Sequence, residues 1–165
     1  MSRFFPHTAY AEDQPFSHAI LSTHVLTRGF QAGAAMGPLV ALPWYMIRKR
    51  TLPLAPTLMR SIGVGSLAGT GLLTVGLAAR MWDKEPIEWA DRSWRLLENK
   101  GQVECDDWSY SGAVMGAAAA ALARTNMGWR GILGGTGLGS IVGVGGYMVY
   151  RYGIKGGKWE DNKRL

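Results

Sequence analysis

The sequence is poor in cysteine, histidine and acidic residues. Its single cysteine, Cys105, excludes an intrachain disulfide and a cysteine-based metal cluster. The three histidines, His7, His18 and His24, lack the H-x-x-x-H and H-E-x-x-H spacings of helical zinc sites. We therefore expect no metal centre. The 18 Lys and Arg against 12 Asp and Glu give a net charge of +6. The basic residues cluster at the ends of apolar runs, which is typical of membrane proteins and not of a nucleic-acid-binding face.

Charged side chains and histidine are absent from four long stretches of the chain. A proton or cation pathway needs ionisable groups facing the interior of a helix bundle. An enzyme needs a reacting constellation such as Ser/His/Asp, and none has supporting context here. We therefore expect a non-catalytic protein without cofactor, nucleic acid or small-molecule substrate. The four uncharged stretches are residues 29–47, 61–79, 109–123 and 131–150.

The length and composition of these stretches predict membrane-spanning helices. A helix of about 20 residues is about 30 Å long, the thickness of the hydrocarbon core of a bilayer. Short connections join the first stretch to the second and the third to the fourth. The expected fold is therefore an all-α membrane protein with four transmembrane helices, arranged as two glycine-rich hairpins.

Glycines recur every fourth residue in each of the four stretches. This spacing places them on one helical face, where another helix can approach closely, and we expect these faces to dock neighbouring membrane helices. A nucleotide-binding loop is the alternative reading of GGTGLGS, but Val142 breaks the G-x-G-x-x-G pattern, and Asn126 to Arg130 form no preceding strand. The predicted helix-packing residues are Gly29, Gly33, Gly37, Gly65, Gly69, Gly112, Gly116, Gly131, Gly135, Gly139 and Gly143.

A charged connector separates the two expected hairpins. Asp83 and Pro86 suggest the N-cap and first turn of an amphipathic helix, and Gly101 its end. We expect the carboxylates of residues 83–107 to form salt pairs on the helix surface, with Glu88 paired to Arg92 and Asp91 to Arg95. One apolar face holds Ile87, Ala90, Trp94 and Leu97. The expected organisation is an amino-terminal polar segment (1–28), a first hairpin (29–79), the connector (80–108), a second hairpin (109–150) and a basic tail (151–165).

Basic and aromatic residues flank the expected spans. Arginine and lysine at the ends of spans reach lipid headgroups, and Trp and Tyr favour the membrane interface. The predicted headgroup or interface residues are Arg48, Lys49, Arg50, Arg124, Arg130, Trp44 and Tyr150.

The four glycine-laddered stretches, the short basic loops and the turn RTNMGWRGILGGTGLG resemble a mitochondrial inner-membrane family. That family includes protein-import channel subunits and an accessory subunit of respiratory complex I. The overall size and the connector WDKEPIEWADRSWRL are more similar to NUXM-like accessory membrane subunits of fungal complex I. The import family carries an Asp in the turn before the last ladder, where this chain has Asn126 and Gly128.

The resemblance implies a multi-pass protein of the mitochondrial inner membrane, with its termini in the intermembrane space. It implies a structural role in the membrane arm of complex I, with contacts to core membrane subunits and to a phospholipid such as cardiolipin. Two alternatives stay open: a subunit of an inner-membrane protein-import translocase, and a small-solute channel.

Overall fold

The computed structural model describes residues 4–47, 53–123 and 127–157, and within these ranges the secondary structure is helical, without strands. The prediction of an all-α fold is confirmed. The helices are the 3₁₀ helix η2 (Ala11–Asp13), α1 (Ser17–Ile47), α2 (Leu54–Met81), α3 (Pro86–Glu98), α4 (Lys100–Leu122), α5 (Trp129–Met148) and the π-helical turn η3 (Val149–Ile154).

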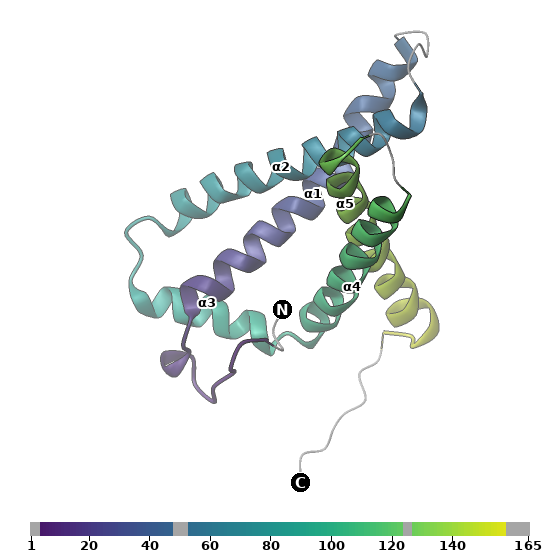
Figure 1. Ribbon diagram of the computed structural model, residues 1–165. Helices are drawn as coiled ribbons and strands as arrows, with labels where there is room; N and C mark the ends of the chain where they lie inside the picture. The colour runs from purple at the N-terminus through teal and green to yellow at the C-terminus, as the bar shows by residue number, and fades with distance from the viewer. Residues whose placement is uncertain (1–3, 48–52, 124–126, 158–165) are drawn as a thin grey trace.

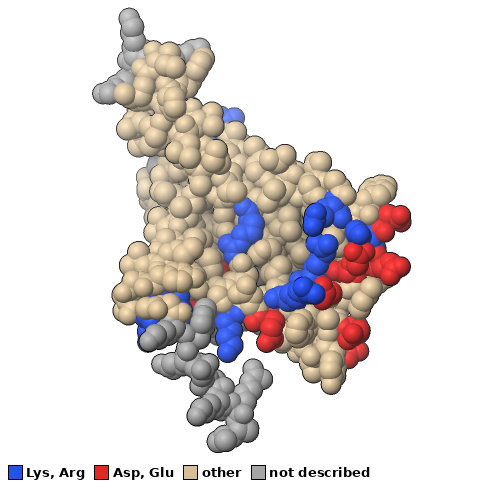
Figure 2. All heavy atoms as spheres, turned by 180° about the vertical axis from the view of Figure 1, so that it is seen from behind, with Lys and Arg blue, Asp and Glu red and all other residues tan. Residues whose placement is uncertain are grey.

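The long helices form two hairpins (Figure 1). Helix α1 packs along α2, and α4 packs along α5. The hairpins meet mainly where α5 crosses α2, with a smaller contact between α5 and α1. Helix α3 lies across one end of the molecule and packs on α1 and η2. Figure 2 shows that most charged side chains on the rear face gather towards this end.

Helices α1 and α4 both begin before the expected spans. Helix α1 starts at Ser17, after Phe16 with a positive φ of 57°. Helix α4 starts at Lys100, where the Asn99 side chain accepts a hydrogen bond of 3.1 Å from the Gln102 backbone N–H. Hydropathy locates apolar stretches, whereas a helix continues through polar residues that pack on the rest of the chain. Both helices therefore extend beyond the apolar stretches that begin at Gly29 and Ser109.

The ends of α3 also differ from the prediction. Its N-cap is Glu85, which forms a reciprocal capping box with Glu88, and Pro86 occupies the first turn. Asp83 precedes this cap with a positive φ of 60°, so it is a turn residue. Gly101, expected to end the helix, lies in the first turn of α4 instead. Asp83 and Gly101 are residue types that favour helix ends, but each lies two residues outside the actual cap, Glu85 or Asn99.

The inner face of α3 covers the amino-terminal segment. The Trp94 indole donates a 3.0 Å hydrogen bond to the Thr8 carbonyl, and Trp89 stacks on His18 with ring centroids 4.0 Å apart. Ala90, Ser93 and Leu97 are buried. Ile87, at the start of the helix, is 43% exposed.

The surface ion pairs of the connector are partly those expected. Arg95 contacts Asp91 at 3.0 Å, whereas Glu88 contacts Lys84 at 3.1 Å rather than the predicted Arg92. The hydrogen bond from Lys84 is the main cause that lowers the pKa of the Glu88 carboxyl.

Two of the helical segments, not the expected four, are long and apolar enough to cross a membrane. They are Leu54–Met81 and Trp129–Ile154, within the part of the chain that the structure describes. The polar first turns of α1, together with Pro38 and Pro43, lower its mean hydropathy. Helix α4 begins with a charged segment and continues largely with alanine. Length and hydropathy therefore mark one helix of each hairpin.

Large apolar side chains lie mostly outside the molecule, and small residues lie inside. Exposed examples are Val64 (66%), Leu72 (71%), Val75 (68%), Met115 (72%) and Val142 (63%). Glycines are buried on α1, α2 and α5 where these helices contact one another. Water-soluble domains usually bury more of their large apolar side chains than this.

Candidate functional site

The predicted glycines of α1 face those of α2. A Cβ atom at Gly29 would lie 2.7 Å from the carbonyl oxygen of Gly69, and one at Gly33 would overlap the carbonyl oxygen of Gly65. A Cβ at Gly37 would overlap the carbonyl oxygen of Ser61. The two backbones are thus in direct contact, and even alanine would force them apart.

A second seam of the same kind joins α4 to α5. A Cβ at Gly135 would lie 2.5 Å from the Gly116 carbonyl oxygen, and one at Gly112 would overlap the carbonyl oxygen of Gly139. A Cβ at Gly143 would overlap the Trp108 carbonyl oxygen. The remaining predicted glycine, Gly131, is buried and lines a groove beside this seam.

Helix α5 has a further glycine face that the sequence reasoning missed. A Cβ at Gly137 would lie 2.7 Å from Ile62 Cγ2 and 3.1 Å from the Cβ of Ala34. A Cβ at Gly134 would overlap the Met59 carbonyl oxygen. This face holds the second hairpin against the first. The doubled glycines at 134–135, followed by Gly137, were the signal in the sequence.

The glycine faces are therefore occupied by helices of the same chain. The expectation that they form open docking strips for neighbouring proteins is corrected by this arrangement. What the described helices present outward is mainly larger aliphatic side chains, of which Val64 and Leu72 on α2 are examples.

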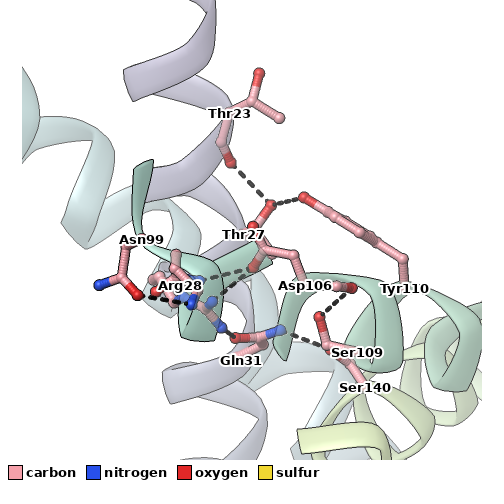
Figure 3. Close-up of polar contacts among 10 residues, drawn as sticks. Thr23, Thr27, Arg28, Gln31, Asn99, Asp106, Ser109, Tyr110 and Ser140 are labelled. Atoms are coloured by element: carbon pink, nitrogen blue, oxygen red, sulfur yellow. Dashed lines mark hydrogen bonds and ion pairs between the residues drawn. The ribbon is translucent and has the colours of Figure 1, made fainter. Parts of the chain in front are cut away.

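A buried polar cluster between α1, α4 and α5 also joins the two hairpins (Figure 3). The Arg28 guanidinium lies 2.6 Å from the Asp106 carboxylate and also donates to the Gln31 side-chain oxygen. The Gln31 amide donates a 3.0 Å hydrogen bond to the Ser140 hydroxyl, and Gln102 donates to Asp106 at 2.9 Å. The cluster thus connects α1, α4 and α5, and we call it the polar joint.

The charged groups of the polar joint are a buried carboxylate and a partly buried guanidinium. The Asp106 side chain is 3% exposed and that of Arg28 is 25% exposed. A buried charge is tolerated only when it is paired and hydrogen-bonded, and here each has a partner on another helix. Asp106 was assigned to helix-surface salt pairs from the sequence, and that expectation was wrong. Its partner lies 78 residues away in the chain.

A second ion pair ties η3 to α4. Arg151 is 7% exposed, and its Nε donates a 3.0 Å hydrogen bond to Glu104. Glu104 is another carboxylate expected on the helix surface that instead holds two segments together. The pair lies at the same end of α4 as the polar joint.

The predicted interface residues divide into two groups. Tyr150 stacks on Trp108 at 5.5 Å, the Arg130 guanidinium lies 5.5 Å from the Trp129 ring, and Trp44 is 59% exposed. The others, Arg48, Lys49, Arg50 and Arg124, lie outside the described residues. Among the residues that are described, no group of three His, Cys, Asp or Glu could hold a metal ion.

Comparison with known proteins gives a family but no activity. No curated protein matches the chain. The model of a family described as protein of unknown function (DUF1757) matches residues 11–150, which include α1 to α5 and both glycine seams. Since the match covers most of the chain, this protein belongs to the DUF1757 family.

Proposed function

We propose that the protein is a four-helix membrane protein and a non-catalytic accessory subunit of the membrane arm of mitochondrial complex I. The observation that carries the membrane assignment is the distribution of side chains. Glycine backbones meet inside, while Val64, Leu72, Met115 and Val142 cover the outside. Such a surface is stable in lipid and prone to aggregation in water.

In this proposal all four long helices cross the bilayer, over residues 29–47, 61–79, 109–123 and 131–150. Helices α1 and α4 pass the apolar region as seam partners of the more hydrophobic α2 and α5. Lower hydropathy costs less in a helix that shares much of its surface with a neighbour. Helix α3, with its many charges, lies at one interface.

The accessory role rests on the absence of reacting groups among the described buried residues and on the resemblance of the spans and connector to NUXM-like subunits. The buried charges of the polar joint are paired with each other, so they serve helix orientation rather than transport. The partner-facing surface is the exposed aliphatic side of α2. The location is the mitochondrial inner membrane, with the end that carries α3 towards the intermembrane space.

Native electrophoresis of mitochondria solubilised in mild detergent tests this proposal. The tagged protein should migrate with complex I, and its deletion should lower the amount of assembled complex. Migration as a free protein of about 18 kDa, or with an import translocase and with loss of carrier import on deletion, would contradict it. Solute flux through reconstituted liposomes would favour a channel instead.

A further inference from the structure

An apolar groove with a volume of about 1000 Å³ runs along α4 and α5. Glycine and alanine of these helices form most of its lining, together with Met115, Leu138 and Val142. Met59 of α2 lines it as well, so both hairpins contribute. The groove extends along α4 from Asp107 to Ala123. At 1.5 Å per residue this is about 24 Å, most of the thickness of a bilayer core.

The lining of the groove suits an acyl chain. Beyond Ser111, the α4 residues that line it are glycine, alanine and Met115, so this stretch offers an apolar chain no polar side chain.

The two ends of the groove differ in charge. The end at Met59 and Gly131 is next in sequence to Arg60 and Arg130, and residues 48–60 and 123–135 contain no Asp or Glu. The opposite end is lined by Asp107 and Trp108. An anionic headgroup is attracted to the first end by its arginines.

The first end also offers hydrogen-bond donors. Helix α5 begins there at Trp129, and its N-cap, Gly128, supplies no side-chain cap. The first backbone N–H groups of a helix carry partial positive charge and bind phosphate. The Arg130 guanidinium is exposed beside them, over the Trp129 ring.

We propose that this groove binds one anionic phospholipid. Its phosphate lies at Arg130 and the start of α5, and its acyl chains run along the groove towards Asp107. This inference rests on the proposed membrane location. The lipid would fill a space between α4, α5 and α2. It would therefore stabilise the contact between the hairpins as well as the seam between α4 and α5.

Native mass spectrometry of the purified chain in detergent tests the proposal. Phosphatidylglycerol and phosphatidylcholine with the same acyl chains are added as probes. The wild type should retain one phosphatidylglycerol in preference to phosphatidylcholine. Arg130→Gln should weaken the retention of phosphatidylglycerol by about tenfold, the effect of one charge-assisted hydrogen bond to its phosphate. Ala119→Leu fills the groove and should reduce binding of both lipids, whereas Ala118→Leu, exposed on the same helix but outside the groove, should not.

Equal retention of both lipids by the wild type, or equal binding by the two leucine variants, would overturn the proposal. A second copy of the chain or a protein in place of lipid would also overturn it. If Ala119→Leu unfolds the chain, Arg130→Gln still tests the proposal, because substitution of the exposed Arg130 should leave the fold intact. A chain that stays folded without detergent would refute the membrane location itself, whereas a detergent-dependent chain without lipid preference refutes only this inference.

Discussion

The Arg28 guanidinium on α1 contacts the Asp106 carboxylate on α4 at 2.6 Å. The two residues belong to different hairpins and are 78 positions apart. The glycine contacts of α5 with α2 position the hairpins through shape alone, while this ion pair adds a directional bond. We expect the pair to favour one orientation of the hairpins over others.

Breaking this pair should destabilise the protein more than replacing it. Asp106→Asn or Arg28→Gln alone leaves a buried charge without its partner, and each should lower the free energy of unfolding by about 3 kcal/mol, the lower end of the usual range because Arg28 is partly exposed. The double variant Arg28→Gln with Asp106→Asn should lose less than the sum of the two single losses. Thermal unfolding in detergent measures all three, and additive losses would show that the residues do not interact.

The glycine seams can be tested with matched alanine variants. Gly33→Ala and Gly139→Ala place a methyl group against a facing backbone and should destabilise the fold by about 1–3 kcal/mol. Gly71→Ala and Gly145→Ala face open space and should be neutral or stabilising by up to about 1 kcal/mol, because alanine favours helix. Unfolding midpoints of the four variants give the comparison. Equal effects of the two seam variants and the two open-space variants would mean that the seams are not close contacts.

Acidification should weaken the fold through His24. This residue precedes the proposed span in α1, and burial, with a smaller contribution from Arg28, lowers its pKa to about 4. Its ordinary pKa is about 6.5, so between pH 6.5 and 4 the unfolded chain binds more protons than the folded one. The stability from this group is therefore complete above pH 6.5 and is lost as the pH falls towards 4.

NMR titration of His24 and unfolding midpoints between pH 4 and 7 check this prediction. The loss of stability in this window should be smaller in His24→Gln. A titration midpoint near 6.5 in the folded protein would contradict it.

The packing of the amino-terminal segment on α3 depends on Trp94. Trp94→Phe removes the hydrogen bond to the Thr8 carbonyl, which should cost about 1 kcal/mol and expose the segment before α1 to protease. Trp82→Phe changes a side chain that is 80% exposed and should leave cleavage unchanged. Limited proteolysis followed by mass measurement distinguishes the two; the same cleavage rate in both variants would argue against the packing role.

The sequence predicted the helices and their glycine contacts better than their polar contacts. Spacing of four places Gly33 and Gly65 on helical faces without reference to the rest of the fold, and both meet across the first seam. Hydropathy, in contrast, could not show that α4 begins at Lys100, because its first turns are polar. The partner of Asp106 was equally hidden, since it depends on how the hairpins cross.

The second glycine face of α5 illustrates the same limit. Gly134 and Gly137 are not four residues apart, so a search for ladders passes over them. They face α2 because α5 is packed on two sides at once, by α4 through one face and by the first hairpin through the other. Only the tertiary arrangement assigns these glycines a role.

The depth of Leu72 in a bilayer tests the account most directly. Leu72 lies in the middle of the proposed second span and is 71% exposed. In a Cys105→Ser background, a nitroxide attached at Leu72→Cys in lipid nanodiscs should be accessible to oxygen and shielded from a water-soluble nickel reagent, with a label at Arg95→Cys on α3 showing the reverse. A label at position 72 that the nickel reagent reaches as readily as the one at position 95 would contradict a membrane-embedded fold.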